Sequence, residues 1–115
     1  MMQSRIAKML LAALGTAAGW QLTLAPACAA DAAAGAKLYA TKCRTCHGPN
    51  GEGNPGMAKA LKVEIKPLGS EDVQKKSDAD LKKSVTDGIG KMKGVAALSP
   101  GDVDDLVAHM RSMKK

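Results

Sequence analysis

The residues of this sequence with the clearest chemical use stand together at Cys43-Arg44-Thr45-Cys46-His47. Two thiols three positions apart lie on one side of a helical turn, where they can form thioethers with the two vinyl groups of one porphyrin. The imidazole that follows can then bind the porphyrin iron from the same turn. Because the tethers and the ligand must come from one rigid segment, this C-x-x-C-H spacing predicts covalent attachment of a c-type haem.

Three other interpretations of the two cysteines have less support. A thioredoxin-like redox pair requires a strand-helix-strand setting, whereas the surrounding pattern is helical and rich in glycine. A zinc site requires two further ligands, and the only other His or Cys in residues 31–115 is His109. A structural disulfide leaves His47 without a role. The motif therefore favours haem.

A second iron ligand is expected from the segment that runs from Gly88 to Gly94. Met92 stands there in a flexible basic loop rather than on the apolar face of a helix. A solvated methionine is a poor use of an apolar side chain, whereas a thioether sulfur suits haem iron and raises its potential. Filling a gap under the loop is the alternative role for this side chain.

Four other side chains could compete for that position, namely Met57, Met110, Met113 and His109. Met57 is too close to His47 in the sequence to reach the opposite face of the haem easily. The two later methionines belong to an apolar helix stripe, and the histidine fits a surface pair with Asp105, one turn earlier. Met92 is therefore the expected sixth ligand, and His109 or an open position is the alternative.

The segments around the motif are expected to be a helix and a loop. The helix is predicted over residues 32–43, where Gly35, Tyr39 and Cys43 fall at helical spacing on one face. The tyrosine is expected to be a packed core residue rather than a ligand. Residues 48–66 contain four glycines and two prolines, which predicts a long irregular loop that wraps the haem.

The two later helices have clear ends. Ser77 is predicted to cap the middle helix, which ends at Gly88. Its apolar residues recur every four positions and are Leu81, Val85 and Ile89. Ser99 is predicted to cap the last helix, with Pro100 at N1 and Asp102 at N3. One apolar stripe follows, made of Val103, Leu106, Val107, Met110 and Met113. The predicted architecture is all-α, with three main helices and long loops around one haem.

Residues 1–30 have the layout of a cleaved secretory signal peptide. A basic start with Arg5 and Lys8 precedes an apolar run and then small residues. The run is short and interrupted, which argues against a retained membrane span. Cleavage is expected after Ala30 or the residue before it, so residues 31–115 are predicted to form one domain in a bacterial periplasm.

The composition of that domain also suggests a large cofactor. Without Arg5 and Lys8, the chain contains 15 basic and 11 acidic residues, which gives a net charge of +4. Tyr39 is the only aromatic residue left, and so small a domain buries only about 60% of its unfolded surface. An apolar cofactor would supply the missing core.

The moderate charge and the lack of stacking aromatics disfavour nucleic-acid binding. Lipid anchoring at Cys28 is disfavoured by the residues that precede it.

From residue 31 onward, the sequence resembles the small class I cytochromes c over essentially its whole length. The matching pieces are Gly35 to Tyr39, Cys43 to Gly48, Asp87 to Met92 and Leu106 to Met113. The resemblance implies that Cys43 and Cys46 bind haem c covalently, with His47 as the proximal and Met92 as the distal ligand. It also implies that the first and last helices cross near Gly35.

Two further details follow from this resemblance. The family places a proline after the haem motif whose loop carbonyl accepts the proton of the proximal imidazole, and Pro55 is the best match. The last helix of the family usually carries an aromatic residue where this chain has His109. The contact between the helices is therefore expected to be looser, or titratable near neutral pH.

A haem iron with a side chain on each face has no open place for a substrate. The sequence therefore predicts a soluble, monomeric periplasmic one-electron carrier rather than an enzyme. Lys91 and Lys93 would form a basic rim that steers docking onto acidic faces of redox partner proteins, or else a plain solvated surface. The alternatives are a haem enzyme or ligand sensor in which Met92 is displaced, and a haem subunit of a larger oxidoreductase.

Overall fold

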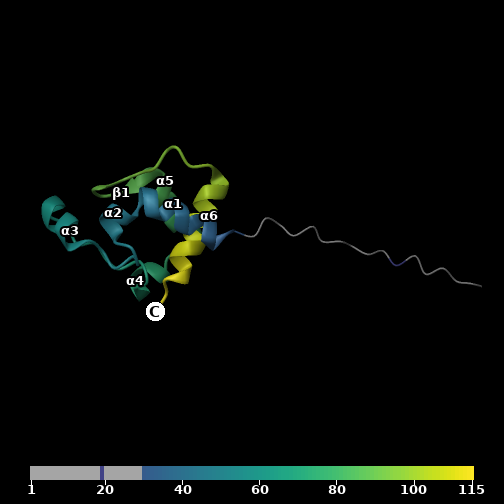
Figure 1. The fold of residues 1–115 in the computed structure, drawn as a ribbon, viewed down its shortest axis with the longest axis horizontal. Coiled ribbons are helices and arrows are strands. Elements are labelled where there is room, and N and C mark those ends of the chain that lie inside the picture. The colour runs from purple at the N-terminus through teal and green to yellow at the C-terminus, as the bar shows by residue number, and fades with distance from the viewer. Residues whose placement is uncertain (1–18, 20–29) are drawn as a thin grey trace, which may run out of the picture.

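The computed structural model describes residues 19 and 30–115, so the predicted signal peptide and its cleavage site lie almost wholly outside the described residues. The described part is mostly helical (Figure 1). Its elements are α1 (Ala32–Lys42), α2 (Arg44–His47), α3 (Pro55–Leu61), α4 (Glu71–Gln74), α5 (Asp78–Asp87), β1 (Gly88–Ile89), β2 (Met92–Lys93) and α6 (Pro100–Ser112). Within these residues, no helix is both long and apolar enough to cross a membrane.

The centre of the fold is the crossing of α1 and α6. A Cβ atom built on Gly35 would overlap the backbone carbonyl of Asp105 and lie 3.0 Å from the Cβ of His109. The two backbones approach so closely only because Gly35 has no side chain. The start of α1 is fixed in the same place, since the Asp31 amide donates to Asp105 Oδ1 at 2.7 Å. The predicted crossing near Gly35 is confirmed.

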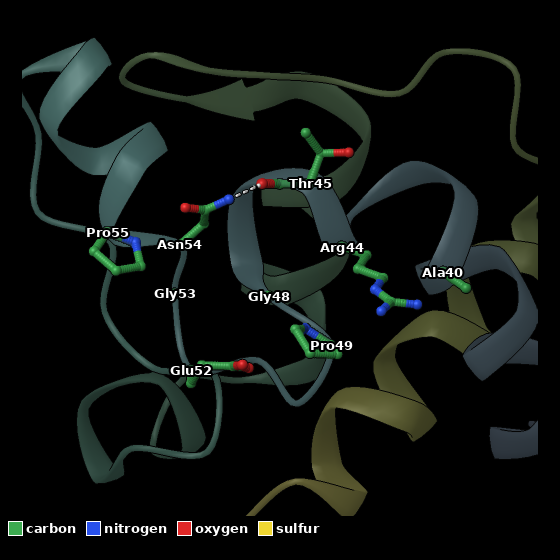
Figure 2. A pocket seen from close by; sticks show the side chains of 9 residues that line it. All are labelled: Ala40, Arg44, Thr45, Gly48, Pro49, Glu52, Gly53, Asn54 and Pro55. Carbon is green, nitrogen blue, oxygen red and sulfur yellow. Dashed lines mark hydrogen bonds between the residues drawn. The ribbon is translucent and has the colours of Figure 1, made fainter.

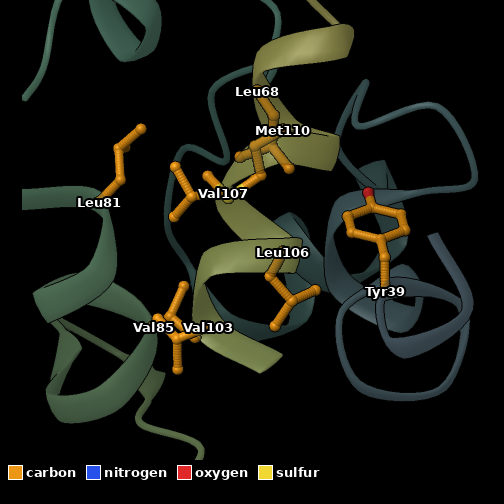
Figure 3. Close-up of a cluster of buried hydrophobic side chains, with 8 residues drawn as sticks. All are labelled: Tyr39, Leu68, Leu81, Val85, Val103, Leu106, Val107 and Met110. Carbon is orange, nitrogen blue, oxygen red and sulfur yellow. The ribbon is translucent and has the colours of Figure 1, made fainter. Parts of the chain in front are cut away.

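The hydrophobic core lies on both sides of α6. It consists of Tyr39, Leu68, Leu81, Val85, Val103, Leu106, Val107 and Met110. Figure 3 shows α6 between Tyr39 of α1 on one side and Leu81 and Val85 of α5 on the other. The predicted stripe on the last helix is confirmed, as is the core position of Tyr39, which is 3% exposed.

Serine side chains begin both long later helices, as predicted. Ser77 Oγ accepts the Asp80 amide at 3.1 Å. Ser99 and Asp102 form a reciprocal capping box, with both side-chain to backbone bonds at 3.1 Å. The middle helix ends at Gly88, whose φ is 81°. Ile89 lies beyond that end, so its predicted place on the apolar face is wrong, and its side chain is 56% exposed.

The segment 48–66 is not wholly irregular, because it contains α3. Asn54 Oδ1 accepts the Gly56 amide at 2.9 Å and the Met57 amide at 3.4 Å. Pro55 occupies N1, where its ring favours a helix start. Pro55, one of the two prolines that suggested a loop, therefore begins a helix, and the helix ends at Lys62 with φ of 55°.

Hydrogen bonds from one side chain of α4 and one of α6 join these helices to neighbouring segments. Gln74 Nε2 donates to the carbonyls of Leu68 and Met110 at 2.8 and 3.0 Å. The guanidinium of Arg111 donates to the carbonyls of Gln74 and Lys76, both at 2.6 Å. It also donates two bonds to Asp78 Oδ1. These bonds connect α6 to the segment between α4 and α5.

Candidate functional site

The predicted haem motif occupies a single helical turn. Cys43 ends α1 and precedes α2, which carries Cys46 and His47. The amide of His47 donates to the Cys43 carbonyl at 3.0 Å, and the amide of Gly48 donates to the Arg44 carbonyl at 2.8 Å. Both thiols are free and half-buried. The two cysteines and the imidazole therefore come from one rigid turn, as the spacing requires.

The loop that follows fixes this turn from its carbonyl end. The Gly53 amide donates to the His47 carbonyl at 2.7 Å, and the Asn54 amide donates to the Cys46 carbonyl at 2.9 Å. Asn54 Nδ2 donates to the Thr45 carbonyl at 2.9 Å (Figure 2). These bonds satisfy carbonyls that a helix end leaves free. Asn54 is not among the residues predicted from the sequence, and its only local signal is its place before a proline.

Tyr39 supports the other side of the turn. Its hydroxyl donates to the carbonyl of Gly48, the residue after His47, at 2.5 Å within the core. Burial, together with the nearby Cys43 and Glu52, raises the pKa of this phenol to about 12. The hydroxyl therefore keeps its proton at neutral pH and remains a donor to the turn.

The imidazole of His47 has the character of a metal ligand. It is half-buried, and burial lowers its pKa, which favours the neutral ring that can bind a metal. Its Nδ1 atom is buried and has no hydrogen-bond partner among the described residues. The implied bond from this ring to the Pro55 carbonyl is therefore not formed. Pro55 stands in the first turn of α3, where its carbonyl belongs to the helix.

Met92 lies in the hairpin of β1 and β2, half-buried and paired with Ile89. Figures 1 and 2 both show this hairpin beside α2. Its tip is joined to the end of α3, because Lys91 Nζ donates to the Leu61 carbonyl at 2.7 Å. The segment predicted to bring the second ligand is therefore joined to the end of α3.

Most of the competing ligands have other contacts. Met110 is 9% exposed in the core, and Met113 packs against that core. The ring of His109 meets the ring of Tyr39 edge to face, with centroids 5.1 Å apart. The expected surface pair of His109 with Asp105 is wrong, because the carboxylate accepts the Asp31 amide instead. The histidine thus makes a ring contact from α6 to α1.

A cavity of about 450 Å³ lies between α2 and the loop that follows it. Arg44 and Thr45, the two residues between the cysteines, line it together with Glu52 and Asn54 (Figure 2). Neither cysteine contributes to it, and neither does His47 or Met92. Its lining does not match the chemistry of the motif, so it is a separate surface feature.

The donor set fits a covalently attached porphyrin better than a bare metal ion. Two free thiols are available for thioether bonds, and one neutral imidazole is available for iron. Among the described residues, no three His, Cys, Asp or Glu side chains are grouped to hold a metal ion. The imidazole of His47 makes no hydrogen bond through its buried Nδ1 atom among the described residues, so the ring is not committed to a structural contact there.

Comparisons with known proteins agree with this assignment. Residues 30–110 match the sequence profile of a family described as cytochrome c oxidase, cbb3-type, subunit III. Among solved structures, the fold is similar to that of the KustC0563 c-type cytochrome, with a TM-score of 0.61 and 30% sequence identity. The alignment covers 70% of this chain and 98% of the other. A comparison with curated proteins finds no match.

Proposed function

This chain belongs to the c-type cytochromes, which carry electrons on covalently bound haem c, and we propose that Cys43, Cys46, His47 and Met92 hold the haem. The two cysteines would form the thioethers, and His47 and Met92 would be the axial ligands. The observation that carries the proposal is the α2 turn, where two free thiols stand beside an imidazole with a buried, unpaired nitrogen.

The protein residues would hold the ligand geometry fixed during a change of one electron. When bound, the haem supplies an iron that alternates between the ferric and ferrous states. Gly53 and Asn54 donate hydrogen bonds to carbonyls of α2, and the hydroxyl of Tyr39 donates to the carbonyl of the residue after α2. The backbone of this turn therefore has little freedom to move. A rigid ligand turn keeps the two oxidation states alike in structure, which favours fast electron transfer.

An electron carrier is favoured over an enzyme because two side chains would fill both axial positions. The thioether of Met92 would also raise the reduction potential relative to a second histidine. The competing functions, a ligand sensor or a haem enzyme, need a sixth position that opens. The core positions of Met110 and Met113 and the contact of His109 with Tyr39 leave Met92 and Met57 as the methionine candidates.

The partners would be redox proteins that present acidic faces. Ile89, 56% exposed, stands on the hairpin next to Met92. It lines a surface cavity of about 380 Å³ together with two lysines and one acidic residue, Lys76, Lys83 and Asp80. Lys91 and Lys93, from the same hairpin, add two more positive charges. An apolar contact with more basic than acidic neighbours suits an acidic partner whose docking weakens as salt rises.

The absorption spectrum tests the proposed ligands. The holoprotein would be recorded oxidised, reduced and reduced under carbon monoxide, as wild type, Met92→Ala and Met57→Ala. Wild type and Met57→Ala should show a low-spin spectrum with the methionine to ferric iron charge-transfer band and should not react with carbon monoxide. Met92→Ala should lose the band and bind the gas. Loss of the band in Met57→Ala, with Met92→Ala unchanged, would move the ligand to α3.

We also propose that the chain is cleaved near Ala30 and that the mature domain is a monomer in the periplasm. The basic start and apolar run of residues 1–30 support this location. The intact mass of holoprotein purified from the periplasmic fraction tests it. The measured mass should match a chain that begins at Asp31 or Ala30. The mass of the full-length chain, found in the membrane fraction, would contradict both the cleavage and the location.

A further inference from the structure

A single hydrogen bond joins the hairpin that carries Met92 to a segment 30 residues earlier in the chain. Lys91 Nζ donates to the carbonyl of Leu61 at 2.7 Å. Leu61 is the last residue of α3, and Lys91 is one of the two central residues of the hairpin turn. The bond therefore runs between the tip of the hairpin and the end of a helix.

The Leu61 carbonyl needs a partner that its own helix does not supply. The chain leaves α3 through Lys62, whose backbone lies in the left-handed region. The amides of Lys62 and the next residue donate to the carbonyls of Ala58 and Lys59. The carbonyl of Leu61 lies beyond the reach of these bonds. A helix end carries partial negative charge, so an ammonium group is a favourable partner for it.

The hairpin has few other attachments. Its strands pair with each other, Gly88 with Lys93 and Ile89 with Met92. The remaining bonds at its base lead to α5, from the amide of Gly88 to Ser84 and from the amide of Val95 to Val85. Among the described residues, the bond of Lys91 is therefore the hydrogen bond that links the hairpin to a part of the fold other than α5.

We propose that Lys91 is a positioning residue that latches the hairpin onto α3 and so keeps the Met92 sulfur on the iron. Without the latch, the hairpin would pivot on its base at α5 and the sulfur would leave the iron more often. The inference rests on the proposed role of Met92. It assigns Lys91 a task different from that of Lys93, although the two lysines flank the same methionine and carry the same charge.

The rate of carbon monoxide binding to the reduced holoprotein tests the latch. The gas can bind only after the sixth ligand has left, so its limiting rate at high gas concentration reports hairpin opening. The variants are Lys91→Leu, Lys91→Arg, Lys93→Leu and Met92→Ala. Leucine removes the donor without offering the iron a new ligand, and Lys93→Leu makes the same charge change two residues away.

Lys91→Leu should open faster than wild type by a factor on the order of threefold to tenfold, the range expected for loss of one ordinary hydrogen bond, because Lys91 is exposed to solvent. Lys93→Leu should stay within about twofold of wild type, and Lys91→Arg, which keeps a charged donor, should lie close to it. Lys91→Leu should lose no more unfolding free energy in urea, relative to Lys93→Leu, than its faster opening implies, because the same bond is lost in both measurements. A clearly larger loss would show that the contact supports the core and does not act on the hairpin alone.

Two results would overturn the latch, and they differ in what else they overturn. If Met92→Ala binds the gas rapidly while both leucine variants open at the same rate, the latch is wrong and the ligand stands. If wild type already binds the gas as fast as Met92→Ala, then Met92 is not the ligand. The proposed function and the latch then fail together.

Discussion

The two regions that would support the axial ligands are built in opposite ways. The crossing of α1 and α6 brings backbone against backbone at Gly35 and Asp105, and it is surrounded by the core. The hairpin of β1 and β2 has two paired positions, an exposed Ile89 and one lysine bond to α3. The turn that carries His47 thus follows directly on the helix that crosses α6, whereas the hairpin that carries Met92 is attached at a few points.

This difference predicts that mutations in the two regions affect different properties, the stability of the fold in one and the binding of the sixth ligand in the other. A change at the helix crossing disturbs contacts that every part of the core shares, because interiors are close-packed. A change in the hairpin disturbs few buried contacts and acts mainly on the segment that it belongs to. Mutations in the first region should therefore lower the free energy of unfolding, and mutations in the second should mainly change the behaviour of the sixth ligand.

The largest effect is expected from Gly35→Ala. The new methyl group would overlap the Asp105 carbonyl, and because the obstacle is backbone, the helices must move apart. The free energy of unfolding should fall by about 3 kcal/mol or more, near the upper end for overpacked cores. Urea unfolding of the holoprotein measures this. Gly101→Ala in the first turn of α6 is the control, since its nearest outside atom is 3.8 Å from the new carbon. Equal losses in both variants would refute the steric explanation.

A smaller loss is expected from Arg111→Leu. This substitution leaves the carbonyls of Gln74 and Lys76 without their donor and frees the carboxylate of Asp78. The free energy of unfolding should fall by about 2 kcal/mol, the scale for loss of charge-assisted bonds at a half-buried site. Lys114→Leu removes the same charge at an exposed position and should change stability little. If both variants lose the same amount, net charge rather than hydrogen bonding is responsible.

In the hairpin, Gly90→Ala should have a more modest effect on unfolding. Gly90 has φ of 57°, but a Cβ atom there meets nothing within 4 Å. Only the backbone conformation opposes the change, at a cost of about 1 kcal/mol. Gly90→Asn should cost less, since asparagine tolerates this conformation. A loss as large as that of Gly35→Ala would show that the hairpin is part of the cooperative core, and the comparison above would fail.

The smallest effect is a pH dependence that comes from His109. Burial against Tyr39 lowers the pKa of this imidazole below its ordinary value of 6.5. Because the unfolded chain binds the proton more tightly, stability is fully present above pH 6.5 and declines as the pH falls below it. Unfolding curves at pH 7.5 and 5.5 for wild type and His109→Phe measure this. The phenylalanine variant should lose less stability on acidification, and identical slopes would exclude His109 as the source.

The local features of this fold could be predicted from the sequence because local chemistry determines them. Ser77 and Ser99 each begin a helix through bonds to amides three residues away, and the C-x-x-C-H spacing fixes one helical turn. The helix at Pro55 was missed because Asn54 and Pro55 favour loops and helix starts alike. The position of Ile89 was wrong because the periodicity continued past the glycine that ends α5.

Contacts between distant segments could not be predicted in the same way. Nothing near Lys91 indicates that its partner is the carbonyl of Leu61, and nothing near His109 indicates that it packs on Tyr39 rather than pairing with Asp105. Such contacts depend on the path of the chain between the two residues. The haem ligands themselves remain predictions, and the spectra described above test them.

The meeting of α1 with α6 also constrains the order in which this protein can form. Asp31 and Asp105 are 74 residues apart in the sequence, yet the amide of the first binds the carboxylate of the second. The central interface therefore closes a loop that includes nearly the whole domain, and it cannot form until α6 has been synthesised. Until then, Cys43 and Cys46 belong to a chain whose main interface is still open, which would leave both thiols accessible for the proposed attachment of haem.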